Sequence, residues 1–226
     1  NKETKKISLL EKKILAQNTP EIISLDRMYM DSLSKKTSVY GVPWFTERKV
    51  NKKEFYHDKI LITSGGTEQL DDIFLDFIKR LTKKNISKEI FLDNKLFKKL
   101  KNKRIKGFSK IKIFKFTEKC FSSIDAIICR PGIGILTDCV SYLIPPIVIY
   151  DNKNPEIYHN ANKIMSLKLG IAIKVKENQI REHQFQEILS FINSKEKLFS
   201  FQKNLLNEKT NGHKEAANKI IKELFL

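Results

Sequence analysis

The sequence predicts an α/β fold, in which a Rossmann-like open parallel sheet of about six strands carries helices on both faces. Short continuous apolar runs, typical of strands buried on both faces, recur along most of the chain. Stretches with helical spacing of apolar residues separate them. Strands that alternate with helices form a parallel sheet, because each crossover returns the chain to the edge from which it started. The predicted strands are 59–63, 89–92, 110–116, 125–129, 146–150 and 171–175.

Helices are predicted between these strands, after the last one and before the first. Leu70, Phe74 and Phe77 belong to an apolar stripe of helical period that begins after the first strand. Gly170 is expected to end the helix before the last strand, as a C-cap. The predicted helices are 7–17, 22–33, 70–81, a short one from 118, 132–143, 154–169, 177–193, 195–207 and 213–225.

This pattern divides the chain into three parts. Residues 1–57 are polar and irregular, and 37–50 contain glycine, proline and tryptophan with little periodicity, which is typical of a linker. Residues 58–194 carry the alternating strands and helices. Residues 195–226 are helical and are expected to pack back toward a domain that precedes the sheet.

The composition is that of a globular protein with a strong positive charge. Hydrophobic residues make up 41% of the 226 residues, enough for a buried core, and the longest apolar runs are too short to span a bilayer. The net charge of +17 comes mostly from lysine, as on a solvated surface. The stretch 83–119 exceeds that background, so peripheral contact with an anionic membrane is the alternative there, and nucleic-acid binding is less favoured.

Three cysteines without a CxxC pair argue against a disulfide framework and against a zinc site. Cys129 and Cys139 lie in apolar segments, so we expect buried, unreactive thiols in a reducing compartment. No signal peptide is recognisable. The expected location is cytoplasmic, either free or at the inner face of the membrane.

Glycines follow the first predicted strand, in the sequence Ser64-Gly65-Gly66-Thr67. Glycine allows a tight turn and a close approach of the backbone to a ligand, and the following helix directs free N–H groups at an anion. Thr67 can either cap that helix or donate its hydroxyl to a phosphate. The pattern is neither a Walker loop nor a GxGxxG fingerprint, and many βα turns contain two glycines for structural reasons alone.

A second glycine-containing turn follows the fourth predicted strand. Gly132 and Gly134 stand at the start of another helix, just after Arg130. Arg130 can pair with a phosphate or hold the loop. Asp138, further along the helix, can accept hydrogen bonds from two vicinal hydroxyls, such as those of a ribose, or can be a plain surface residue.

Polar residues gather at the start of the helix after the fifth strand, where Glu156, His159 and Asn160 lie about one turn apart. Side chains at this spacing share a face and can hold a ligand with many hydroxyls. His159 can instead be a packed, hydrogen-bonded histidine. No second histidine stands at ligand spacing, so no metal site is predicted. All three segments follow carboxyl ends of predicted parallel strands, where open α/β sheets bind ligands.

In their order along the chain, these segments resemble the C-terminal, donor-binding domain of GT-B glycosyltransferases of family 28, the MurG-like group. The resemblance covers about half of the chain. It implies the C-terminal half of a GT-B enzyme, a Rossmann-like domain that binds a nucleotide-sugar. The matching segments are 60–67, 116–118, 125–132, 137–138, 144–145 and 156–161.

The resemblance also implies roles for single residues near the nucleotide. Gly65, Gly66 and Thr67 match the loop beside the donor diphosphate. Phe116 and Thr117 match the segment beside the base.

Further residues match the ribose and the sugar, with two departures. Asp138 stands where the family usually has a glutamate that holds the ribose, and Leu143 replaces a common glycine. Glu156, His159 and Asn160 match the segment that faces the donor sugar. The departures leave open which base and which sugar are bound.

We therefore expect a glycosyltransferase that transfers a hexosyl or N-acetylhexosaminyl group from a UDP-linked nucleotide-sugar. The acceptor is unknown; a lipid-linked acceptor in cell-envelope polysaccharide synthesis is one option. No cofactor or metal is implied, and no general base is identifiable. Residues 1–57 are too short for the acceptor-binding domain of a GT-B enzyme, so a preceding domain or a partner subunit is expected to supply it. The alternatives are a nucleotide-sugar hydrolase or epimerase, or a non-catalytic donor-binding subunit.

Overall fold

The computed structural model describes residues 21–29, 38–50, 57–66, 68–84, 86–102, 111–176 and 179–225. The chain forms two compact units, one of Asn1–Phe45 with Lys209–Leu226 and one of Thr46–Glu208. The helix expected at 7–17 lies outside the described residues. The division into three parts made from the sequence stays a prediction.

A six-stranded parallel sheet forms the centre of the larger unit, which confirms the predicted fold class. The strand order is β5-β4-β3-β6-β7-β8. The chain therefore builds the sheet outward from β3 in one direction and then outward from β6 in the other. The strands are β3 Lys59–Thr63, β4 Glu89–Leu92, β5 Ile111–Ile113, β6 Ala126–Cys129, β7 Pro146–Tyr150 and β8 Ile171–Lys174.

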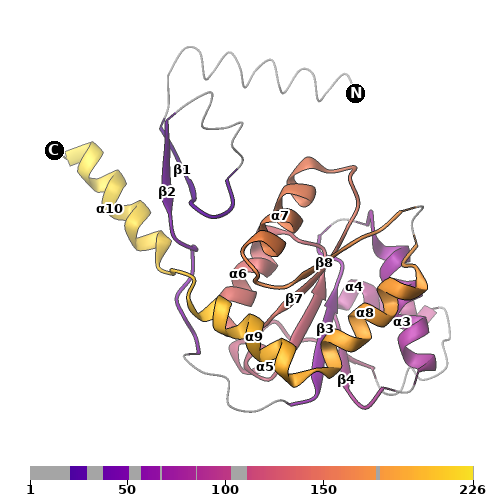
Figure 1. The fold of residues 1–226 in the computed structure, drawn as a ribbon. Coiled ribbons are helices and arrows are strands. Elements are labelled where there is room, and N and C mark those ends of the chain that lie inside the picture. Colours follow the sequence, from indigo (N-terminus) through magenta and orange to yellow (C-terminus); the bar gives the residue numbers. More distant parts are fainter. Residues whose placement is uncertain are drawn as a thin grey trace. The chain divides into compact units, whose positions relative to one another are not determined.

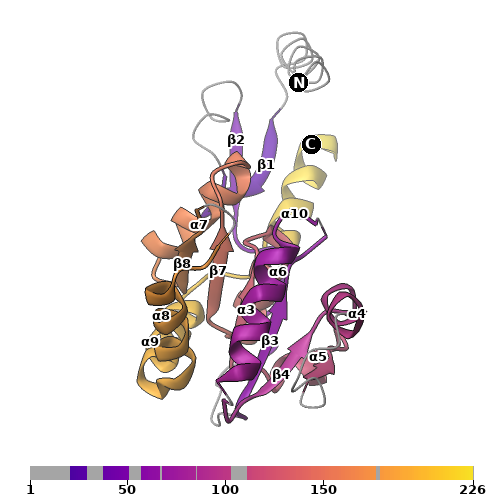
Figure 2. The ribbon, with the colours of Figure 1, turned by 90° about the vertical axis from the view of Figure 1, so that its right-hand side faces the viewer.

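Helices cover both faces of this sheet (Figure 1, Figure 2). Its helices are α3 Asp71–Lys83, α4 Asn94–Asn102, α5 Glu118–Ser122, α6 Ile133–Tyr142, α7 Pro155–Ser166, α8 Glu182–Asn193 and α9 Lys195–Leu206. Alternate strand residues such as Ile60, Ile128 and Ile149 form one core with α3, α4 and α8. The helices α6 and α7 lie on the opposite face. Both faces of β6 and β7 are buried, which explains their continuous apolar sequences.

Helix α4 was not expected from the sequence. Only Leu96 and Leu100 of this nine-residue helix are buried, so its apolar periodicity is too brief to recognise. Asp93 provides the N-cap, because its carboxylate accepts from the backbone N–H of Leu96 at 2.8 Å. The helix thus depends on its cap and on packing against the sheet more than on its own pattern.

The smaller unit contains a two-stranded parallel sheet and a helix, β1 Ile22–Leu25, β2 Val39–Val42 and α10 Gly212–Phe225. The prediction of a helix at 22–33 is therefore wrong over 22–29, and the stretch 37–50, predicted to be irregular, contains the strand β2. Residues 43–50 form no helix or strand, as predicted. The aliphatic run of β1 finds its hydrogen-bonding partner in β2, which local spacing cannot reveal. Trp44 joins the two chain segments of this unit, since its N–H donates to Lys209 O at 3.1 Å and its carbonyl accepts from Gly212 N at 2.9 Å.

Left-handed backbone in the larger unit is not confined to glycine. Leu143 caps α6 with φ 53°, at the position where the resemblance notes a common glycine. Lys168 takes φ 53° after α7, which ends at Ser166. The prediction that Gly170 is the C-cap is therefore wrong. Gly170 is needed for packing instead, since a Cβ there would lie 2.0 Å from the Pro146 carbonyl oxygen.

Arg48 fastens the start of the larger unit to two helix ends. Its guanidinium donates to the carbonyl oxygens of Val140, Leu205, Leu206 and Glu208 at 2.6, 3.0, 3.2 and 2.6 Å. The last carbonyls of a helix have no partner within the helix, so these bonds complete α6 and α9. Burial lowers the pKa of Arg48 and the Glu208 charge opposes this, yet an arginine stays protonated.

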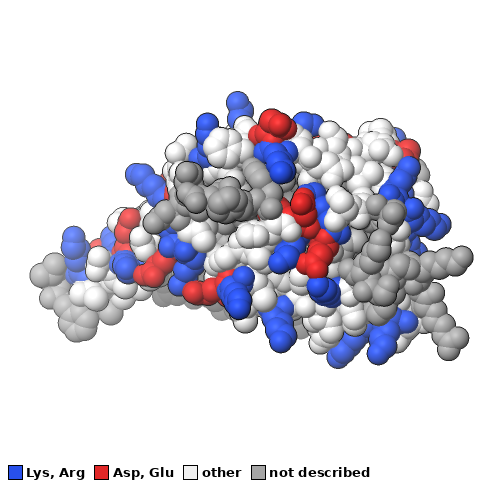
Figure 3. Space-filling view, turned by 90° about the horizontal axis from the view of Figure 1, so that it is seen from below, with Lys and Arg blue, Asp and Glu red and all other residues white. Residues whose placement is uncertain are grey.

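Two predictions made from composition concern the cysteine thiols and the surface charge. Cys129 and Cys139 are buried, as predicted, and burial raises the pKa of the Cys129 thiol. Lysine and arginine are spread over the face in Figure 3 with acidic residues among them. In the described part of the chain, no helix combines the length and apolar character that crossing a membrane requires.

Candidate functional site

The candidate site lies at the carboxyl ends of the central strands. The winding of the sheet reverses between β3 and β6, which are hydrogen-bonded neighbours. In open α/β sheets the loops at such a point diverge and leave a crevice that binds ligands. The glycine turns at 64–66 and 130–134 follow these two strands, and the turn at 151–154 follows β7, the next strand along.

Side-chain hydrogen bonds tie the three turns together. The amide nitrogen of Gln69 donates to the two carboxylate oxygens of Asp151 at 3.3 and 3.5 Å, which links the β3–α3 loop to the end of β7. The amide nitrogen of Asn160, in α7, donates to the carbonyl of Pro131 at 2.9 Å. The segments singled out in the sequence are therefore held as one assembly.

The glycines of these turns differ from the other glycines that the structure describes. A Cβ added at Gly65, Gly66, Gly132 or Gly134 would meet no atom of the described residues within 4 Å. A Cβ at Gly170, by contrast, would collide with backbone. Gly65 has φ 76°, which favours glycine, but the other three have no such need. Glycine at these turns leaves space at the crevice and is not required for packing.

The β3–α3 loop starts from a fixed point. Ser64 is fully buried, its hydroxyl donates to Asp71 at 2.5 Å and its N–H donates to Asp93 at 3.2 Å. The helix begins only at Asp71, with Leu70 as an N-cap that makes no side-chain bond. This start lies within one residue of the helix predicted at 70–81. Thr67, expected to cap the helix or contact a phosphate, lies outside the described residues.

Two charged side chains stand at the second turn and its helix, Arg130 in the turn and Asp138 in α6. Neither Arg130 nor Asp138 makes a hydrogen bond or ion pair through its side chain within the described part of the chain. Both are partly buried. Burial raises the pKa of Asp138 to about 6. A half-buried carboxylate without a compensating bond among the described residues costs stability, which makes Asp138 a candidate for the site.

Phe116 begins a row of aromatic rings that ends on the helix of Asp138. It is 55% exposed, and its ring centroid lies 5.9 Å from that of Phe121. Phe121 stacks on Tyr142 of α6 with centroids 5.0 Å apart. Thr117 is the N-cap of α5, where its hydroxyl accepts from Cys120 N at 3.4 Å. The structure thus gives Phe116 an open ring face and Thr117 a positioning role.

The residues at the start of α7 that were predicted to face the donor sugar differ in exposure and in their contacts. Asn154 caps the helix by accepting from Glu156 N at 2.9 Å, and the Glu156 side chain is exposed. His159 is half-buried. Asn160 is 1% exposed and holds Pro131, so it positions the β6–α6 turn. A contact of these residues with a donor sugar stays a prediction.

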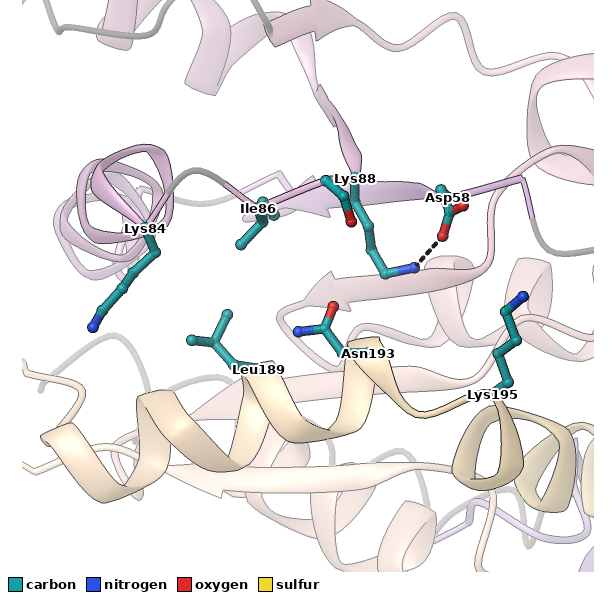
Figure 4. Close-up of a pocket in the computed structure, with 8 residues that line it drawn as sticks. Asp58, Lys84, Ile86, Lys88, Leu189, Asn193 and Lys195 are labelled. Carbon is teal, nitrogen blue, oxygen red and sulfur yellow. Dashed lines mark hydrogen bonds and ion pairs between the residues drawn. The ribbon is translucent and has the colours of Figure 1, made fainter.

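A groove lies at the opposite edge of the sheet, beside the amino-terminal ends of β3 and β4 (Figure 4). The Lys88 side chain is only 6% exposed and donates to Asp58 at 3.0 Å. The other lining residues are Lys84, Ile86, Ser87, Leu189, Asn193 and Lys195. Because ligands of this fold bind at the carboxyl ends and Lys88 is already paired, we do not assign this groove to the candidate site.

The parallel sheet with helices on both faces defines a Rossmann-like α/β domain. The family model of the glycosyltransferase family 28 C-terminal domain matches residues 59–222. The chain belongs to this family, as the sequence resemblance indicated. No curated protein matches it in sequence.

Glycosyltransferases of known structure share the fold. MurG of Acinetobacter baumannii is 15% identical with a TM-score of 0.65, over 89% of this chain and 66% of MurG. The glycotransferase of kitacinnamycin is 14% identical with a TM-score of 0.60, over 92% of this chain and 56% of that one. TarM is 13% identical with a TM-score of 0.63, over 95% and 45%. The chain thus spans between 45% and 66% of these structures.

Proposed function

We propose that the carboxyl edge of the sheet binds a UDP-linked nucleotide-sugar and that the chain is the donor half of a glycosyltransferase. The observation that carries the proposal is the set of open glycine turns together with Arg130 and Asp138, whose side chains make no hydrogen bond or ion pair within the described part of the chain. Backbone N–H groups and a guanidinium suit a diphosphate, and a carboxylate suits the two hydroxyls of a ribose. Membership of family 28 supports glycosyl transfer as the reaction class.

In this proposal the chain stabilises the departing diphosphate and does not form a covalent intermediate. Transfer is a direct displacement at the anomeric carbon. Gly65, Gly66 and Thr67, with the N-terminus of α6 and Arg130, would stabilise the charge that develops on the leaving group. Phe116 would flank the base, and Glu156 with His159 would face the sugar. No step requires a metal, so EDTA is expected to leave nucleotide binding unchanged.

The acceptor half is proposed to lie in a preceding domain or a partner subunit, because solved neighbours are longer than this chain. The chain alone would then bind nucleotide but transfer sugar poorly. We place the reaction in the cytoplasm, with the lysine-rich stretch 83–119 touching an anionic membrane. Vesicles with and without anionic lipid would test that contact.

Calorimetric titration with UDP, dTDP and UDP-sugars tests the donor site. One neighbour, VinC, was solved in complex with dTDP at 11% identity and a TM-score of 0.52, which makes the choice of base worth measuring. We expect UDP to bind at one site. Absence of binding by every nucleotide would sink the proposal. With labelled UDP-sugar and no acceptor, free sugar would indicate a hydrolase and an isomerised sugar an epimerase.

The substitution Gly132→Ser, in the second turn, is expected to weaken UDP binding without destabilising the fold. Gly132 is the N-cap of α6 with extended backbone, and serine is at least as good a cap, so stability should change by less than about 0.5 kcal/mol. The added hydroxymethyl enters space that the ligand would occupy, so UDP affinity should fall about tenfold. Thermal unfolding and calorimetry measure the two. Equal UDP affinity in parent and variant would remove Gly132 from the site.

A further inference from the structure

We propose that Lys95 of α4 is a positioning residue, which turns the Gly65–Gly66 peptide so that its N–H faces the donor diphosphate, and that Lys99 supports it through Asp71. The inference rests on the proposed function, since it names how the β3–α3 turn is prepared for its ligand. Neither lysine belongs to a segment that the sequence singled out for binding.

Lys95 holds the turn directly. Its ammonium donates to the carbonyl oxygen of Gly65 at 2.9 Å and pairs with Asp71 at 2.9 Å. In a trans peptide the carbonyl and the following N–H point in opposite directions, and the chain contains no cis peptide among its described residues. Fixing the Gly65 carbonyl toward Lys95 therefore directs the N–H of Gly66 away from α4.

The N–H of Gly66 is available to a ligand. No acceptor for it occurs among the described residues, and a Cβ at Gly66 would meet only open space there. Because glycine has no preferred rotation of this peptide, the orientation has to come from a contact outside the turn. Lys95 provides that contact.

Lys99 and Lys95 together also neutralise the Asp71 carboxylate near the turn. Asp71 is 3% exposed, and a lone carboxylate at this place would repel a diphosphate. Lys99 pairs with Asp71 at 2.8 Å and with the exposed Glu68 at 2.9 Å. Burial acts to raise the pKa of Asp71, but the hydrogen bonds from Lys99, Ser64 and Lys95 outweigh it and lower the pKa, so the carboxylate is ionised and neutralised.

The helix that carries both lysines is fixed to the same turn. One carboxylate oxygen of Asp93 accepts from the N–H of Ser64, and the other caps α4 at Leu96. The start of the turn and the start of the helix thus share one anchor. The ammonium of Lys95 is therefore held at a defined place relative to Gly65, as a positioning role requires.

The test compares Lys95→Met and Lys99→Met with Lys98→Met, a matched control. Lys98 is exposed on the same helix and has no side-chain partner among the described residues. Its replacement by methionine removes the same charge as the other two substitutions. Calorimetry gives UDP affinity, competition NMR gives uridine affinity, and the amide nitrogen chemical shift of Gly66 in the nucleotide-free protein reports on the bond that Lys95 donates to the preceding carbonyl. Lys95→Arg serves as the conservative variant, and thermal unfolding confirms that each variant folds.

For Lys95→Met we expect UDP affinity to fall about tenfold with uridine affinity unchanged, and the amide nitrogen signal of Gly66 to shift. Lys99→Met should lose about threefold for UDP, Lys98→Met should match the parent, and Lys95→Arg should recover part of the loss. Equal losses in Lys95→Met and Lys98→Met would show a general charge effect and overturn the inference while leaving the proposed function intact. If the parent binds no nucleotide, the proposed function fails. An unchanged amide nitrogen signal of Gly66 in Lys95→Met would overturn the positioning role.

Discussion

Asp138→Asn is expected to weaken UDP binding about 30-fold while making the protein more stable. Two hydroxyls of a ribose would lose a charged acceptor, which corresponds to about 2 kcal/mol. The opposite sign for stability follows from burial, which raises the pKa of Asp138 from 3.8 to about 6 without a partner to offset it. Calorimetry and urea denaturation on the same samples measure both effects.

The size of the stability difference between Asp138→Asn and the parent depends on pH. Because the folded state holds the Asp138 proton more tightly than the unfolded chain does, stability is lost as the pH rises from about 4 to about 6 and the loss is complete above that. Asparagine cannot ionise. The variant should therefore exceed the parent by about 1 kcal/mol at pH 7.5, after allowance for solvent screening, and should match it near pH 4.

Nucleotide binding should follow the same titration. Only the ionised carboxylate accepts from both hydroxyls, so the UDP affinity of the parent should fall about tenfold for each pH unit below about 6. The terminal phosphate of the ligand also titrates near pH 6, so the informative quantity is the ratio of parent to Asp138→Asn affinities. A ratio that stays constant between pH 5 and 8 would mean that Asp138 does not contact the ligand.

Arg48→Met should cost about 3 kcal/mol in the free energy of unfolding. The variant leaves four carbonyl oxygens at the ends of α6 and α9 without their donor, and bonds from a charged group are the stronger kind. Lysine has a single ammonium and cannot reach all four acceptors, so Arg48→Lys should recover only part of the loss. Denaturant unfolding followed by circular dichroism gives the values.

Arg181→Met is the matched control for Arg48. The Arg181 side chain is exposed, and its backbone N–H, which donates to Gln184 at 2.9 Å, survives the substitution. Its stability should stay within about 0.5 kcal/mol of the parent. If both arginine variants lost the same amount, the carbonyl contacts of Arg48 would not be the source of the stabilisation.

The sheet could be predicted from the sequence because three of its inner strands, β3, β6 and β7, are buried on both faces. The run at 146–150 is found as a strand with unchanged bounds, since five apolar residues in succession fit no surface helix. The strands β1 and β2 and helix α4 could not be predicted. Their apolar residues are few, and their stability comes from partners that lie elsewhere in the chain or from a single cap.

The place of the candidate site could be predicted, but its construction could not. Glycines after strand ends are a local signal, and so is the acidic residue at 138. The bond from Gln69 to Asp151 joins residues 82 positions apart, and Lys95 is one lysine among many in a strongly basic chain. Residues that position others carry no signal of residue type, so only the folded arrangement reveals them.

The two kinds of glycine would be told apart by a library of random variants. Substitutions at Gly170, where a Cβ would lie 2.0 Å from a backbone oxygen, should vanish from a selection that asks only for folded, abundant protein. Substitutions at Gly132 and Gly134 should pass that selection and disappear only when growth depends on activity. The difference between the two selections would then outline the ligand at the carboxyl edge of the sheet.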